Sequence, residues 1–180
     1  IGLVGSEMCI RDSYHVPLII NDSLYVAINS GADGIHIGQS DLPAREVRAK
    51  LGPDKILGVT AKTVAQALEA EKAGADYLGS GAVFPSPTKT DAIPMSRETL
   101  TAICQSVSIP VVAIGGINAS NLSTLAGTGI AGAAIISGIF GQPDIGAAVR
   151  ELRECIHKNR RVIPTVPVSY THLRAHETDQ

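Results

Sequence analysis

The strongest constraint on the fold of this chain is a regular alternation between short apolar runs and longer amphipathic segments. The apolar runs, each typical of a buried strand, are Pro17–Ile20, Gly34–Ile37, Ile56–Thr60, Tyr77–Phe84, Pro110–Ile114 and Gly132–Ser137. The segments between them have helical periodicity and are Ser23–Asn29, Pro43–Leu51, Val64–Ala73, Ser96–Ser106, Ser120–Ala126 and Asp144–His157. Six strand–helix units in alternation predict a parallel sheet with helices packed outside it.

A short motif recurs where each helix leads into the next strand. Gly-Ala-Asp begins at Gly31 and again at Gly74, and a looser copy begins at Gly129. The glycine predicts a left-handed helix end, and the aspartate opens the turn into the strand. Reuse of one unit fits either an open doubly wound sheet or a (β/α)8 barrel.

Two observations favour the barrel. The units have nearly equal length, with no change at a midpoint where the strand order would reverse. At least five strands also end in small or polar residues, which a barrel would gather around one mouth. We therefore expect an α/β fold of the TIM-barrel family, incomplete here, because six units are visible and a closed barrel needs eight.

The composition supports one soluble domain and excludes several classes of partner. A hydrophobic content of 44% with 18 glycines and few aromatic residues is typical of a parallel sheet buried on both faces. A net charge of −2 gives no reason to expect binding to nucleic acid or to a membrane, and no apolar run is long enough to cross a bilayer. The three scattered cysteines predict a reduced, cytoplasmic protein.

The two ends of the chain do not share the pattern of the middle. Ile1–Ser13 and Val166–Gln180 resemble translated adapter sequence rather than native protein. We therefore place the domain at residues 16–158, with a non-native-looking flank at residues 1–15 and a largely non-native-looking tail at residues 159–180. On this interpretation the chain is a fragment.

Two groups of residues follow predicted strands and suit a phosphate ligand or the metal ion that accompanies it. Ser86, Thr88 and Lys89 lie in a proline-stiffened loop that suits a phosphate or diphosphate, although alone this loop fits a surface turn equally well. Asp22 and Asp41 follow neighbouring strands; each alone fits a helix-capping role, but together they suit Mg²⁺ bound to a phosphate.

Backbone donors complete the predicted anion sites. Gly116 follows one strand, and Ile136 and Ser137 end the next, as in the usual phosphate site of a barrel. His36 alternates with isoleucines, so we expect a packed, hydrogen-bonded core histidine rather than a base. No catalytic triad or redox cysteine is visible, and the residues predict two anionic ligands and a metal.

With these residues assembled, the chain resembles thiamine phosphate synthase from Val16 to about His157. The matching stretches are Pro17-Leu-Ile-Ile-Asn-Asp22, Gly31-Ala-Asp-Gly-Ile-His-Ile-Gly-Gln-Ser-Asp41, Leu57-Gly-Val-Thr-Ala61, Phe84-Pro-Ser-Pro-Thr-Lys89 and Ala113-Ile-Gly-Gly-Ile117. The resemblance implies that a hydroxymethylpyrimidine diphosphate is joined to a thiazole phosphate, giving thiamine phosphate and pyrophosphate.

The resemblance also implies a role for each site residue. Asp22 and Asp41 would hold Mg²⁺, and the pyrimidine diphosphate would contact Asn21, Thr60 and Lys89, of which Thr60 and Lys89 are the catalytic candidates. The thiazole phosphate would contact Ser86, Thr88, Gly116, Ile136 and Ser137. Thr60 and Ser86 stand where the family often has serine and threonine, and both keep the hydroxyl.

The family's first two strands, which carry a Gln/Arg/Lys cluster for the diphosphate, have no counterpart here. We therefore expect this chain to be inactive or poorly folded. Two alternatives stay open: a thiazole tautomerase-like isomerase, which would not need the Mg²⁺–diphosphate residues, and a non-catalytic phosphate-binding fragment. The oligomeric state is also left open.

Overall fold

The computed structural model describes residues 9, 11–85, 94–158 and 169–170 of the 180-residue chain. Its strands are β1 (Leu18–Asn21), β2 (Gly34–Ile37), β3 (Ile56–Thr60), β4 (Tyr77–Gly81), β5 (Val111–Ile114), β6 (Gly132–Ala134) and β7 (Ser169–Tyr170). Its helices are α2 (Leu24–Asn29), α3 (Ala44–Leu51), α4 (Val64–Lys72), α5 (Arg97–Ser106), α6 (Ser137–Phe140) and α7 (Ile145–Lys158), with a 3₁₀ turn η1 (Leu122–Leu125). The predicted alternation of strands and helices is confirmed, except that the predicted helical segment Ser120–Ala126 forms only the 3₁₀ turn η1.

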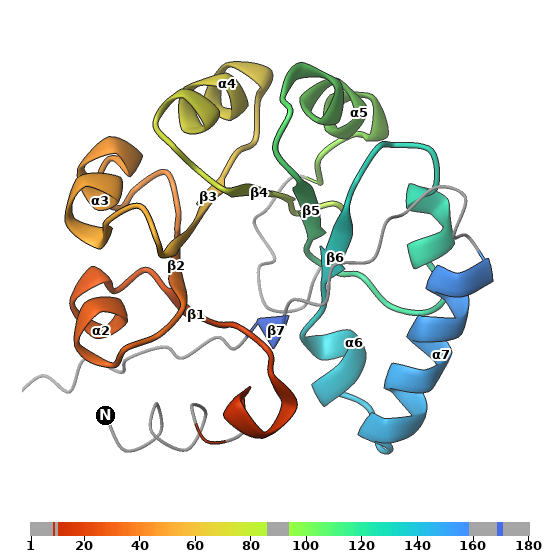
Figure 1. The fold of residues 1–180 in the computed structure, drawn as a ribbon. Helices are drawn as coiled ribbons and strands as arrows, with labels where there is room; N and C mark the ends of the chain where they lie inside the picture. The colour runs from red at the N-terminus through yellow and green to blue at the C-terminus, as the bar shows by residue number, and fades with distance from the viewer. Residues whose placement is uncertain (1–8, 10, 86–93, 159–168, 171–180) are drawn as a thin grey trace, which may run out of the picture.

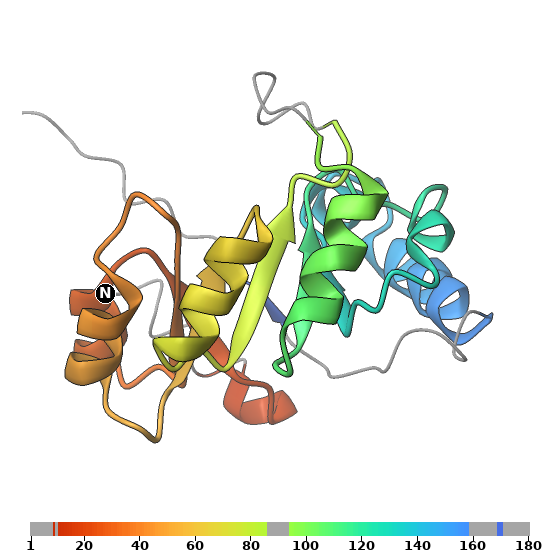
Figure 2. The same ribbon diagram turned by 90° about the horizontal axis from the view of Figure 1, so that it is seen from above.

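The strands form one parallel sheet that curls into a half-barrel with the helices outside it (Figure 1). The strand order is β6-β5-β4-β3-β2-β1-β7, so the first six strands lie in chain order. Since no reversal occurs, the doubly wound alternative is wrong. Because every pairing is parallel, the carboxyl ends of the strands lie at one edge; in Figure 2, β4 points toward the top of the view, where the chain continues to α5.

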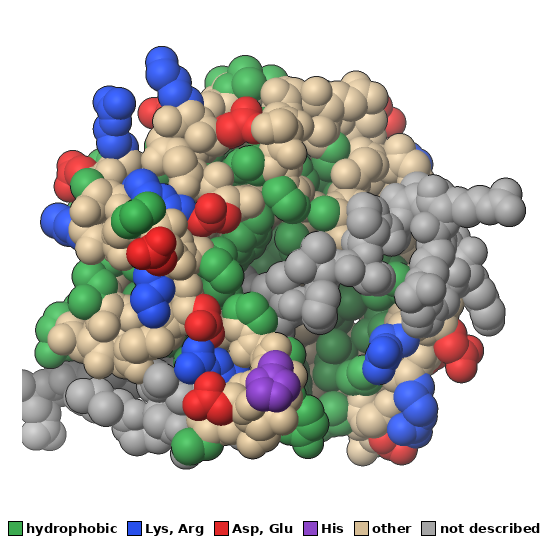
Figure 3. All heavy atoms as spheres, viewed as in Figure 1, with side chains coloured by type: hydrophobic (Ala, Val, Ile, Leu, Met, Phe, Trp, Pro, Cys, Tyr) green, Lys and Arg blue, Asp and Glu red, His purple; other side chains and the backbone are tan. Residues whose placement is uncertain are grey.

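The two faces of the sheet have different surroundings. On the outer face, Ile35, Leu57 and Leu78 are fully buried in one core with helix residues such as Val47 and Ile103. Figure 3 shows hydrophobic side chains lining a hollow near the middle of the molecule, while charged side chains gather over the outer helices. Side chains alternate along a strand, so the residues between these core positions face the inside of the half-barrel.

The recurring Gly-Ala-Asp motif ties neighbouring strands together at their amino ends. Gly31, Gly74 and Gly129 have φ of 72°, 92° and 91°, as predicted for left-handed helix ends. The Asp33 carboxylate accepts a 2.8 Å hydrogen bond from the Leu18 backbone N–H, and Asp76 accepts one of 2.7 Å from Leu57. Each aspartate therefore fixes the start of the preceding strand, a role that the turn interpretation did not include.

Each of these aspartates also binds an arginine. Arg11 pairs with Asp33, and Arg48 pairs with Asp76 while donating to the carbonyls of Gly52, Lys55 and Gly74. Burial works to raise the pKa of the Asp33 carboxyl, but the Leu18 N–H and Arg11 outweigh it and lower that pKa. Two carboxylate clamps thus hold the amino ends of the strands.

Parts of both flanks contact the sheet. Residues 11–14 form a helical turn, and β7 pairs in parallel with β1 at two positions, in the opening between β1 and β6 (Figure 1). Neither segment had a recognisable helix or strand pattern in the sequence. Within the described ranges, no helix has the length and apolar character needed to cross a bilayer.

Candidate active site

The carboxyl end of β1 carries the first two predicted site residues. Asn21 is the last residue of β1 and lies beside His36 in the register of the sheet. Asp22 follows in the left-handed region, with φ of 64°, and its backbone N–H donates to the His36 carbonyl at 2.8 Å. The Asp22 side chain is exposed to solvent. The bond to His36 therefore anchors Asp22 to the neighbouring strand while its side chain stays exposed beyond the strand ends.

Asp41 lies in the loop that follows the neighbouring strand β2. Its carboxylate accepts a 2.6 Å hydrogen bond from the Gly38 backbone N–H, which fixes the loop onto the end of the strand. Both aspartates are hard oxygen donors at the same edge of the sheet, which is the donor chemistry that Mg²⁺ prefers. Among the described residues, no cluster of three or more His, Cys, Asp or Glu could hold a metal, so a two-carboxylate site remains the prediction.

Thr60 ends β3, and its hydroxyl lies 3.0 Å from Nε2 of His36. Gln39 also reaches this strand end, because its side-chain amide donates to the Thr60 carbonyl. Asn21, Asp22, Asp41 and Thr60 therefore lie at the carboxyl ends of three adjacent strands.

His36 is the core histidine that its sequence context predicts. It is 6% exposed, and its Nδ1 lies 3.0 Å from the Tyr77 hydroxyl. Burial lowers the pKa of His36 to about 4, against a smaller opposing effect of Asp41, so the imidazole is neutral at pH 7. Burial also raises the pKa of Tyr77, which stays protonated.

The sequence did not point to Tyr77 as the partner of His36. The available signal was a pair of glycines on the next two strands, because Gly58 on β3 and Gly79 on β4 leave room for the imidazole. A Cβ at Gly79 would lie 2.8 Å from Cε1 of His36, and one at Gly58 would lie 2.5 Å from Nδ1. Such contacts are too short for real side chains, so the ring lies directly on both glycines.

The loops that follow β4, β5 and β6 also lie close to one another. Gly116 has φ of 65°, and a Cβ there would lie 2.5 Å from the Pro85 carbonyl oxygen, at the start of the predicted phosphate loop. Ser86, Thr88 and Lys89 lie outside the described residues. Gly116 thus marks where that loop meets the end of β5.

The end of β6 differs from the prediction. The strand stops at Ala134, whereas the apolar run predicted strand through Ser137; Ile136 and Ser137 are exposed, and Ser137 begins the short helix α6. A Cβ at Gly138 would lie 2.5 Å from the Ile117 carbonyl oxygen. This close approach turns the chain over the loop after β5 and ends the strand early.

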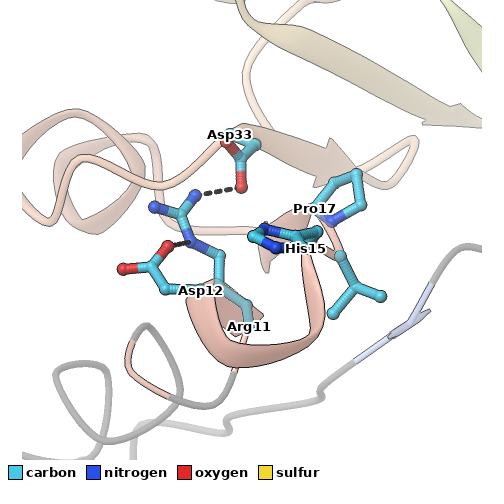
Figure 4. A pocket seen from close by; sticks show the side chains of 6 residues that line it. Arg11, Asp12, His15, Pro17 and Asp33 are labelled. Atoms are coloured by element: carbon cyan, nitrogen blue, oxygen red, sulfur yellow. Dashed lines mark hydrogen bonds and ion pairs between the residues drawn. The ribbon is translucent and has the colours of Figure 1, made fainter.

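One pocket lies at the other end of the sheet. It has a volume of about 480 Å³ and is lined by Arg11, Asp12, His15, Val16, Pro17 and Asp33, which precede β1 and β2 (Figure 4). The Arg11 guanidinium points at Asp12 and Asp33 and pairs with both. Its charge is already matched, and the cavity contains none of the predicted site residues.

A family model and curated relatives match most of this chain. The family model described as thiamine monophosphate synthase matches residues 7–139. A thiamine-phosphate synthase of Ruminiclostridium cellulolyticum is 57% identical over 145 residues, which cover 81% of this chain and 69% of the relative. Thiamine-phosphate synthase 2 of Streptococcus pneumoniae serotype 4 is 53% identical over 148 residues, covering 82% and 70%.

A solved structure shows the same fold. Thiamine phosphate pyrophosphorylase from Pyrococcus furiosus superposes with a TM-score of 0.80 at 38% identity, covering 88% of this chain and 76% of that one. The matched regions include β1 to β6 and the residues at their carboxyl ends. The chain therefore belongs to the thiamine monophosphate synthase family of enzymes.

Proposed function

We propose that the site at the carboxyl ends of β1 to β6 joins 4-amino-2-methyl-5-hydroxymethylpyrimidine diphosphate to thiazole phosphate. The observation that carries this proposal is the placement of Asn21, Asp22, Asp41 and Thr60 after three adjacent strands, in a chain whose relatives are named for thiamine phosphate synthesis. In the parent protein, we propose that these strands belong to an eight-stranded barrel.

The reaction balances without a protein nucleophile. The bond between the pyrimidine methylene and the diphosphate oxygen breaks, and its electron pair leaves with pyrophosphate. The thiazole nitrogen then donates its lone pair to the methylene cation and forms the new C–N bond. The protein must stabilise the leaving charge and hold the two substrates face to face.

The proposed roles follow from charge and position. Asn21, Thr60 and Lys89 bind the pyrimidine diphosphate, and Lys89 and Thr60 stabilise the charge that develops on the leaving group. Asp22 and Asp41 would hold Mg²⁺, which would supply further positive charge there. Ser86, Thr88, Gly116, Ile136 and Ser137 bind the thiazole phosphate.

We also propose a cytoplasmic location and poor turnover by the 180-residue chain itself. Cys9, Cys104 and Cys155 are all free thiols, which fits a reducing compartment. Along the edge of β1 that faces away from β2, the described sheet has only the two-residue β7. The half-barrel described here therefore lacks the two strands that we expect to bind the far side of the diphosphate.

Pyrophosphate release tests the proposal. The purified chain is compared with a chimera that carries, before Val16, the first two strand–helix units of the Ruminiclostridium cellulolyticum relative. We expect Mg²⁺-dependent release in the chimera, loss of that release on Asp22→Asn or Asp41→Asn, and little release from the chain alone. Normal turnover by the chain alone would contradict the proposed truncation effect. Binding of thiazole phosphate without pyrophosphate release in a folded chimera would favour the isomerase or the non-catalytic alternative.

A further inference from the structure

Three side chains form a continuous hydrogen-bonded row across the inner face of the half-barrel. The Tyr77 hydroxyl, the His36 imidazole and the Thr60 hydroxyl are joined by two contacts of 3.0 Å each. The row runs from the first residue of β4 through the middle of β2 to the last residue of β3. It therefore connects the interior of the sheet with the edge where the proposed substrate binds.

The geometry of this row is fixed by its surroundings. His36 lies on Gly58 and Gly79, and the rings of His36 and Tyr77 are 5.4 Å apart with an interplanar angle of 35°. The contacts with both glycines and with the tilted Tyr77 ring favour this orientation of the imidazole. Among the described residues, this orientation places Tyr77 at Nδ1 and Thr60 at Nε2.

The single proton of a neutral imidazole decides whether the Thr60 hydroxyl donates to His36 or accepts from it. A neutral imidazole has one N–H donor and one lone pair, so one nitrogen donates while the other accepts. A phenol is a stronger donor and a weaker acceptor than an aliphatic alcohol, and within the described chain His36 is the hydrogen-bond partner of the Tyr77 hydroxyl. Tyr77 then donates to Nδ1, and the Nε2–H donates to Thr60.

We propose that Tyr77 and His36 are positioning residues that make the Thr60 hydroxyl a hydrogen-bond donor toward an anionic substrate. Because the oxygen of Thr60 accepts from Nε2, its own proton points away from the imidazole. The half-buried position of Thr60 at the end of β3 leaves that proton free to reach a diphosphate oxygen. This inference rests on the proposed function for the role of Thr60 toward substrate.

The tautomer of His36 tests the row independently of any activity. The chain is labelled with ¹⁵N-histidine, and the His36 resonances are identified by their loss in His36→Gln. At pH 7 we expect a protonated Nε2 and an unprotonated Nδ1. Tyr77→Phe keeps the ring packing and removes the donor, so the resonances should move toward a mixture of tautomers. Tyr25→Phe is the matched control, since Tyr25 is 72% exposed on α2, and should change nothing. A protonated Nδ1 in the unsubstituted chain would overturn the proposal.

Ligand binding tests the second half of the inference, with Mg²⁺–pyrophosphate as the probe in a calorimetric titration. We expect Tyr77→Phe and Thr60→Ala each to weaken binding about tenfold to hundredfold, as for loss of one hydrogen bond to a charged group. Because both act through the same hydroxyl, the double variant should bind no more weakly than Thr60→Ala alone.

Additive losses would overturn the coupling between Tyr77 and Thr60. Absence of pyrophosphate binding by the unsubstituted chain and by the chimera would instead overturn the proposed function, and with it the ligand role of Thr60. The tautomer measurement would still decide the hydrogen-bonded row, so the two failures are distinguishable.

Discussion

Acidification should destabilise this protein well before its carboxylates titrate, because folding buries His36 in its neutral form. The pKa of His36 is lowered by burial from 6.5 to about 4. The unfolded chain therefore binds a proton that the folded chain excludes, and stability falls as the pH drops from about 6.5 to about 4. At roughly 1.4 kcal/mol per pH unit, the full loss is about 3 kcal/mol, of which about 2 kcal/mol appears by pH 5.

Urea unfolding at several pH values between 7.5 and 5, without added metal, measures this loss. The range stops at pH 5 because carboxylates with ordinary pKa values near 4 are still mostly ionised there. In His36→Gln, the free energy of unfolding should vary much less over the same range. A flat profile in the unsubstituted chain, or an equal slope in His36→Gln, would refute the reasoning.

Three further predictions concern stability and are measured by urea unfolding at pH 7.5. Ser80→Ala should leave stability unchanged or raise it by about 1 kcal/mol, because the Ser80 hydroxyl is fully buried with no partner within the described structure; a loss above about 1 kcal/mol would reveal one. Gly58→Ala should cost about 1–3 kcal/mol by displacing the Tyr77 and His36 rings, whereas Gly132→Ala, with open space around its Cβ, is the control and should cost much less. Arg48→Lys should destabilise by about 1–3 kcal/mol, because lysine keeps the charge but cannot replace the guanidinium bonds to three carbonyls and Asp76; an unchanged midpoint would exclude that role.

Much of the fold could be predicted because the relevant signals are local. The bounds of β2 and β3 are those of the apolar runs, and Ser23 and Ser96, the first residues of two predicted helical segments, cap their helices. The predicted strand ends were wrong where contacts between residues far apart in the sequence determine where a strand stops. The apolar runs of β4 and β6 continue past the strand ends, where the loops pack against one another.

The site could be predicted only in part. Asn21, Asp22, Asp41 and Thr60 lie after adjacent strands, and their proximity follows from parallel topology. The hydrogen bonds of Thr60 could not be predicted, since they depend on residues 24 and 41 positions apart meeting across three strands. The metal, the substrates and the roles of Ser86, Thr88 and Lys89 stay predictions.

The carboxylate clamps of Asp33 and Asp76 have a consequence for engineering. They hold the amino ends of β1 and β3, at the end of the sheet opposite to the proposed chemistry, so these contacts do not involve the loops that follow the strands. Variants in which those loops are randomised, with Asp33, Asp76 and their arginine partners retained, should therefore keep these contacts while their ligand specificity changes.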